Sequence, residues 1–127
     1  KKGVASAEYD EEGQHLVQFF KAHLAFSKDP KIATQFVVDK FMGKGDPMWG
    51  PEAAAVYGFE EALINIKQPS LLLINSGNFL LEKSKKAEEL RPDFDSVLLE
   101  GGSWDVFETL PQEVVDAVGA WMKSSED

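Results

Sequence analysis

Few side chains in this chain could do chemistry, and the two histidines are the first to consider. His15 and His23 stand eight positions apart on one predicted helix, whereas two histidines that share a metal on a helix are three or four positions apart. No carboxylate stands where it would complete a metal cluster with them. Phe19 lies between the two, so both are predicted to line the edge of an apolar stripe; a catalytic base donated from this helix is the alternative. The sequence therefore predicts no metal site and no cofactor.

Nucleophilic catalysis finds equally little support in the residues. The chain contains no cysteine, which excludes disulfides, thiolate nucleophiles and thiolate metal ligands and is compatible with a reducing, cytoplasmic location. A Gly-x-Ser-x-Gly elbow, the strand-to-helix turn that exposes a catalytic serine, is absent. Ser76 stands beside Gly77, but without the rest of that motif it is predicted to be a turn residue.

The charge of the chain narrows the classes of partner. The net charge is −9 and the pI is about 4.7, whereas nucleic-acid backbones and anionic membranes attract clustered lysine and arginine. The one basic cluster, Lys83 to Lys86, is followed by Glu88 and Glu89, which indicates a solvated helix face. No apolar run approaches the roughly 20 residues of a membrane span, and KKGVASAEYD lacks the apolar centre of a signal peptide. A protein or a small apolar molecule is therefore the expected partner.

Three helices are predicted in the first half of the chain. The first runs from Asp10 to Ser27, with Asp10 as its cap, Glu11 and Glu12 in its first turn and a stripe of Leu16, Phe20 and Leu24. The second starts at the pair Asp29-Pro30 and ends at Gly43, and its apolar positions are Ile32, Phe36, Val37 and Phe41. The third opens at Pro51 and has a stripe of Ala55, Phe59, Leu63 and Ile66.

A turn-rich connection, GKGDPMWGP from Gly43 to Pro51, joins the second and third of these helices and places Met48 and Trp49 in a loop. Exposed loops rarely contain tryptophan. Two alternatives follow and stay open: the ring of Trp49 packs back on the helices, or it lines a pocket.

In the second half the apolar pattern changes from helical to extended. Leu71 to Ile74 is a short apolar run bounded by Pro69 and by Asn75-Ser76-Gly77, as in a buried parallel strand. A helix from about Phe79 to Leu90 and a second strand from Ser96 to Glu100 follow. The last helix has a capping-box pattern at Thr109, Pro111 and Gln112 and a predicted buried face of Val114, Val115, Val118 and Trp121. The order α-α-α-β-α-β-α contains one βαβ unit, so the two strands should be parallel.

Two parallel strands do not make a stable sheet by themselves. Both runs are apolar enough to be interior strands of a covered sheet, and each would leave an unpaired edge. The missing neighbours are therefore expected from a second copy of the chain, in a homo-oligomer, or from a complementary half.

Two segments resemble a known family. IKQPSLLLINSGNFL, Ile66 to Leu80, and LLEGGSWDVFETLPQEVVDAVGAWM, Leu98 to Met122, look like the C-terminal half of an α/β-hydrolase. In that family a proline introduces an apolar strand followed by a Gly-x-x-Asp turn with the catalytic acid. The next strand ends in a glycine turn with the catalytic histidine, before a final helix. The likeness covers about residues 59–122 and implies a partial α/β-hydrolase-like fold, with a helical cap-like region at 1–66 and a βαβα core part with a short parallel sheet at 67–127.

The departures from that pattern decide the functional hypothesis. The resemblance puts Asn78 at the acid position and Trp104 at the histidine position, so neither triad role is filled. Asn78 suits a helix N-cap. Asp105 is either a displaced acid or, with Glu108 three residues on, part of a capping box. Trp104 either fills volume or stacks on a ligand.

The residues and the resemblance together give two functional hypotheses. The first is a non-catalytic binding or interaction module that takes a small apolar ligand, with Trp49, Phe79 and Trp104 as the ligand-binding candidates in one apolar site. The alternative is the C-terminal fragment of a serine-type α/β-hydrolase acting on small esters, with its catalytic residues on a missing or separate N-terminal half. The chain alone is not expected to be active.

Overall fold

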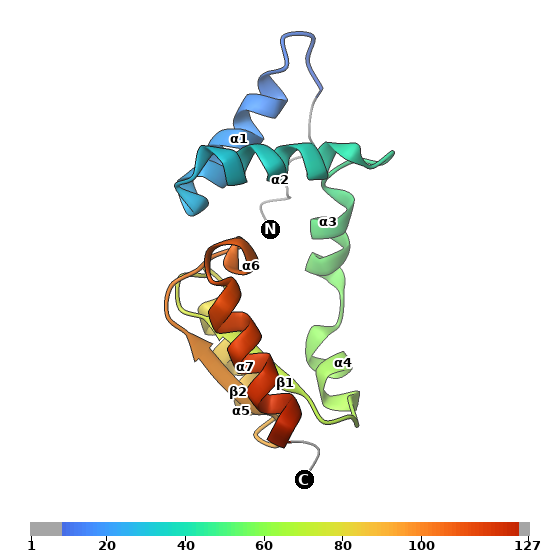
Figure 1. The fold of residues 1–127 in the computed structure, drawn as a ribbon. Helices are drawn as coiled ribbons and strands as arrows, with labels where there is room; N and C mark the ends of the chain where they lie inside the picture. The colour runs from blue at the N-terminus through green and yellow to red at the C-terminus, as the bar shows by residue number, and fades with distance from the viewer. Residues whose placement is uncertain (1–8, 125–127) are drawn as a thin grey trace. The chain divides into compact units, whose positions relative to one another are not determined.

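The computed structural model describes residues 9–124 and shows a mixed α/β protein with a two-stranded parallel sheet (Figure 1). The first eight residues, KKGVASAE, lie outside this range, and so does most of the segment for which the sequence predicts no signal peptide. The chain divides into two compact units, unit 1 up to Tyr57 and unit 2 from Gly58; the sequence-based division at 66/67 would instead group α4 (Phe59–Asn65) with the helical region. None of the helices in residues 9–124 has the length and apolar character that a membrane crossing requires.

In unit 1 the first helix begins later than predicted. Helix α1 covers Gln14–Ser27, and no acidic residue lies in its first turn. Gly13 precedes it with φ 73°, a left-handed conformation that glycine adopts without steric cost and that interrupts the helix. The predicted places of Glu11 and Glu12 in the first turn were therefore wrong, because both residues lie in the turn before Gly13.

Helix α2 covers Pro30–Met42 and confirms the second predicted helix. The carboxylate of Asp29 accepts the N–H of Lys31 at 2.8 Å, and Pro30 occupies the first helical position, where its missing N–H costs nothing. Gly43 follows the last residue in an extended conformation.

Helices α1 and α2 pack against each other mainly through aromatic rings. His15 and Phe19 contact Phe41 with ring centroids 5.7 and 5.2 Å apart, and His23 stacks on Phe36 at 5.0 Å with the planes 5° apart. The contact face of α1 therefore contains both histidines, whereas Leu16 of the predicted stripe is exposed. The two rows differ by one sequence position, about 100° around the helix, a distinction that apolar spacing alone does not make.

The third predicted helix is two short helices. Helix α3 covers Trp49–Val56, α4 covers Phe59–Asn65, and the extended backbone of Tyr57 together with Gly58 separates them. The loop predicted for Trp49 was also wrong, since Trp49 is the first residue of α3 and Met48 is its N-cap. Glycine destabilises a helix interior by about 1 kcal/mol, so the break falls where Gly58 interrupts the apolar spacing.

Unit 2 is built on the predicted βαβ unit. Strand β1, Leu71–Asn75, pairs in parallel with β2, Asp95–Leu99, in the register Leu73↔Val97. Helix α5, Leu81–Leu90, connects them, and the short α6, Val106–Thr109, leads into α7, Pro111–Ser124. The parallel pairing predicted from the sequence is confirmed.

Two side-chain hydrogen bonds show that α5 and α7 lie on opposite faces of the strands. The indole Nε1 of Trp121 on α7 donates to Asp95 at 2.8 Å, and the next residue of β2, Ser96, donates its hydroxyl to Glu88 on α5. Successive strand residues point to opposite faces, so the sheet is a thin middle layer between the two helices. Ile74, Leu99 and Val114 are the buried apolar residues of this unit within the described range.

Three details of this unit differ from the prediction. Leu98 is 53% exposed, so β2 is not covered on both sides. Val115 is exposed, and only Val114 of the predicted α7 face is fully buried. The capping box before α7 is not formed, because the hydroxyl of Thr109 donates to the carbonyl of Asp105 and the amide of Gln112 to Asp116.

The basic cluster on α5 forms ion pairs, as expected of a solvated face, but with other partners than Glu88 and Glu89. Lys85 pairs with Glu82 at 3.0 Å, and Lys86 pairs with Glu60 of α4. The pKa of Lys86 is raised and that of Glu60 lowered by their mutual hydrogen bond. Both groups are open to solvent, so the bridge between α4 and α5 contributes little to stability.

Candidate functional site

The carboxyl ends of β1 and β2 meet, and Ser76 joins them. Its N–H donates to Leu99, its hydroxyl donates to the carboxylate of Glu100 at 3.1 Å, and the same oxygen accepts the N–H of Gly101 at 2.8 Å. Ser76 is therefore a turn residue with a structural task, as predicted. Glu100, which the sequence did not single out, is held at the strand ends by this contact.

Two glycine turns touch at the same place. The N–H of Gly77 donates to the carbonyl of Gly101 at 3.1 Å, and a Cβ built on Gly77 would lie 2.1 Å from the carbonyl oxygen of Gly102. No side chain fits into that distance. Gly101 and Gly102 have φ values of 87° and 65°, so the turn after β2 also requires glycine.

The residues that follow these glycines include two buried polar side chains, Ser103 and Asp105. Ser103 is 7% exposed and Asp105 3%. The side-chain amide of Asn75 donates to the carbonyl of Ser103 at 2.9 Å, and the N–H of Ser103 donates to Asp105 at 3.1 Å. The hydroxyl oxygen of Ser103 is the one buried side-chain polar atom in residues 9–124 that has no hydrogen-bond partner.

Asp105 does not form the predicted capping box with Glu108. It occupies the N-cap position of α6, but its side chain makes no hydrogen bond to that helix and turns back to the N–H of Ser103. The buried carboxylate of Asp105 therefore accepts a backbone N–H of the loop before α6 and none from α6 itself. A catalytic acid orients a histidine, and unit 2 contains no histidine that Asp105 could orient.

Asn78 makes a capping contact, but before a separate turn. Its side-chain oxygen accepts the N–H of Leu80 at 2.8 Å and its carbonyl accepts the N–H of Leu81 at 3.0 Å. Leu80, two residues later than predicted, is the N-cap of α5. At the position where the resemblance places a catalytic acid, the side chain is thus an amide that holds a turn together.

Two of the three predicted ligand-binding residues contact each other. The rings of Phe79 and Trp104 meet edge to face, with centroids 5.4 Å apart and planes at 68°. Phe79 is 61% exposed and Trp104 40%. The third candidate, Trp49, belongs to unit 1, where it is exposed and its ring lies against Gly45, 2.5 Å from where a Cβ on that glycine would stand.

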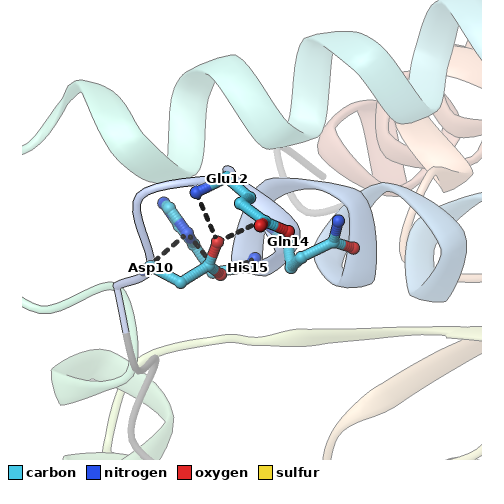
Figure 2. Close-up of polar contacts among 4 residues, drawn as sticks. All are labelled: Asp10, Glu12, Gln14 and His15. Carbon is cyan, nitrogen blue, oxygen red and sulfur yellow. Dashed lines mark hydrogen bonds and ion pairs between the residues drawn. The ribbon is translucent and has the colours of Figure 1, made fainter.

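In unit 1, the side chain of Asp10 makes several hydrogen bonds to the residues that follow it, including His15 (Figure 2). Its carboxylate accepts the N–H groups of Glu12 and Gln14 at 2.9 Å and of His15 at 3.0 Å. Asp10 therefore caps the start of α1 from a distance, across Gly13. The pKa of Asp10 is lowered, chiefly by the bond from Gln14, because these N–H groups favour the charged carboxylate.

The ring of His15 closes the same turn. Its Nδ1 lies 3.4 Å from the carboxylate of Asp10 and 3.3 Å from the backbone N of Asp10. One nitrogen cannot donate to the first and accept from the second at once, so the tautomer decides which bond forms. Tyr9 packs on this ring at 5.0 Å. His15 is therefore packed between Tyr9, Phe41 and the turn before α1.

His23 is buried between the helices of unit 1. Burial lowers its pKa, and the charge of Lys40 lowers it further, so the neutral ring that stacks on Phe36 is the favoured form. Neither histidine forms, with cysteine, aspartate or glutamate of the described residues, a group of three that could hold a metal ion.

A comparison of the chain with protein-family models, with curated proteins and with solved structures found no match. Sequence reasoning reached Ser76, Asn78, Phe79, Trp104 and Asp105 but missed Glu100 and Ser103. The signal that could have found them is their position, since both flank the two glycines at the end of an apolar strand.

Proposed function

We propose that the chain is a non-catalytic binding module built on an α/β-hydrolase-like C-terminal half. A parallel βαβ unit, glycine turns after both strands and a final helix support this proposal. The positions where that family has its acid and histidine hold Asn78 and Trp104. The helical region of residues 1–66, which includes unit 1 and α4, then corresponds to the cap of the resemblance.

The observation that carries the binding role is the edge-to-face contact of Phe79 and Trp104. Both rings keep exposed surface at the carboxyl ends of parallel strands, where α/β proteins usually bind ligands. An apolar ligand with a ring of its own gains contact area and edge-to-face stacking there. A small apolar molecule is therefore the proposed ligand class.

Catalysis is not proposed for this chain. The hydroxyl of Ser76 donates to Glu100, a carboxylate, and unit 2 contains no imidazole to take the proton of a serine. We expect no hydrolysis of p-nitrophenyl acetate above a buffer blank. Saturable turnover that Ser76→Ala abolishes would favour the alternative, a hydrolase fragment with part of its machinery in place.

Binding is tested with 2-phenylethanol, a small neutral molecule with one aromatic ring. A two-dimensional 1H–15N NMR titration should shift the amides of Gly101 to Asp105 in a saturable way, and Phe79→Ala and Trp104→Leu should each weaken the binding. Val115→Ala, at an exposed side chain of α7, is the control and should leave the affinity unchanged. Shifts confined to other residues would contradict the proposal.

We also propose that the missing sheet neighbours come from a second copy or a complementary half. Asp95 donates to Ser70 and Leu99 accepts from Ser76, so alternation along β2 directs the N–H and C=O groups of Ser96 and Leu98 to the other edge. Within residues 9–124 only β1 pairs with β2. An open edge beside the exposed Leu98 supports an interaction by strand addition.

A further inference from the structure

The aromatic pair Phe79–Trp104 lies in chain segments that carry only negative charge. Residues 75–80 and 100–110 contain the carboxylates of Glu100, Asp105 and Glu108 and no lysine, arginine or histidine. The basic side chains of unit 2 that form ion pairs do so elsewhere, Lys85 and Lys86 on α5 and Arg91 with Asp93 after it. Asp105 is buried, so the carboxylates of these segments that a ligand of the rings can meet are those of Glu100 and Glu108, which are exposed.

The rings and the carboxylates favour the same kind of ligand. The face of an aromatic ring carries partial negative charge and attracts cations. Glu100 cannot swing away freely, because its carboxylate accepts the hydroxyl of Ser76 at 3.1 Å. A net charge of −9 adds a long-range attraction for positive ligands. Charge complementarity thus selects a cation and disfavours a carboxylate or phosphate.

An independent observation in the same turn concerns hydrogen bonding. Ser103, between Gly102 and Trp104, is more than nine-tenths buried and its hydroxyl oxygen has no partner. A buried hydroxyl without a partner is costly, and proteins retain such groups where a ligand or water supplies the missing bond. Its oxygen accepts an N–H, which a primary ammonium has and a quaternary ammonium lacks.

We propose that the ligand of the Phe79–Trp104 pair is a small primary ammonium compound with an aromatic group. This inference rests on the proposed binding function and specifies its ligand. The aromatic group packs on the two rings, the ammonium lies among Glu100 and the neighbouring carboxylates, and its N–H satisfies the hydroxyl of Ser103.

The test compares ligands that differ only in the polar group. The NMR titration is run with 2-phenylethylammonium, 2-phenylethanol and 3-phenylpropionate at low ionic strength. The ammonium should bind up to about fivefold more tightly than the alcohol, the range expected for an exposed ammonium–carboxylate pair, and the carboxylate most weakly. Added salt should reduce the difference. Equal affinity of ammonium and alcohol would overturn this inference and leave the binding function intact, whereas no response of the turn to any of the three would overturn both.

Two variants locate the interactions. Glu100→Gln keeps an acceptor for Ser76 but removes the charge, and should reduce the preference for the ammonium; Glu89→Gln on α5 is the charge-matched control and should not. Ser103→Ala should weaken 2-phenylethylammonium and leave its trimethylated analogue, which has no N–H, unchanged. An ammonium preference that survives Glu100→Gln, or equal losses for both ammonium compounds in Ser103→Ala, would contradict the assignment.

Discussion

The side-chain amide of Asn75 donates a hydrogen bond to the backbone carbonyl of Ser103 at 2.9 Å. This bond ties the last residue of β1 to the turn after β2, twenty-eight positions further along the chain. Ser103 is buried, so water does not replace the donor if the amide is lost. The turn that carries Trp104 is thus held from the neighbouring strand.

Replacing this amide should loosen the turn. Asn75→Asp keeps the size of the side chain but sets a carboxylate against the carbonyl of Ser103, and we expect a loss of about 1–3 kcal/mol in the free energy of unfolding. Urea denaturation followed by circular dichroism measures it. Asn65→Asp adds the same charge at an exposed amide that bonds to Glu61, and should cost less than about 0.5 kcal/mol. Equal losses would show that charge alone acts.

The contact of Gly77 with Gly102 predicts a steric penalty. In Gly77→Ala the new methyl group would stand 2.1 Å from a backbone oxygen, so the two turns must separate, at a cost of roughly 1–3 kcal/mol. Gly119→Ala in α7 is the control, because no atom lies within 4 Å of its Cβ. It should stabilise the protein by about 0.5–1 kcal/mol, as alanine does in a helix. Comparable stabilities of both variants would refute the close contact.

The stability that Asp10 gives to the turn before α1 should decrease at acid pH. The pKa of Asp10 in the folded chain lies below its ordinary value of 3.8, so the stabilisation is complete above that value and is lost as the pH falls through the lower folded pKa. Asp10→Asn has no such titration. The difference in melting temperature between wild type and Asp10→Asn should therefore shrink below about pH 3.8. A constant difference would mean that the carboxylate charge does not matter.

The open edge of β2 predicts self-association. We expect sedimentation velocity at micromolar concentration to show a dimer or larger species that persists in salt, because strand addition joins backbone N–H and C=O groups that carry no net charge. Leu98→Pro removes an N–H that points to the open edge and leaves the bonds to β1 intact, so it should yield a folded monomer. Leu98→Ala keeps that N–H and should still associate. A wild-type monomer that unfolds cooperatively would refute strand addition by a second copy.

Much of the fold follows from local signals in the sequence. Asp29-Pro30 and Gly43 bound α2 as predicted, because capping and the missing N–H of proline act within a few residues. The apolar run from Leu71 gave β1, and its parallel partner followed from the helix between them. The start of α1 and the break at Tyr57–Gly58 were missed, since one glycine competes there with an otherwise helical pattern.

The site was less predictable because its contacts are long-range. No local rule tells that Asp105 turns back to Ser103 instead of capping α6, or that Ser76 reaches Glu100. Those contacts depend on the two strand ends meeting. The aromatic residues Phe79 and Trp104 were reached because each follows a predicted strand, and the ends of parallel strands share one edge.

Successive residues of β2 make hydrogen bonds on opposite faces of the sheet, and this affects the register in which β2 pairs with β1. Asp95 bonds to α7 and the next residue, Ser96, bonds to α5. If β2 slid past β1 by a single residue, every side chain of the strand would change face, and both hydrogen bonds would be lost together with the burial of Leu99. The two polar contacts and the burial of Leu99 therefore favour the native register of this two-stranded sheet over one shifted by a single residue.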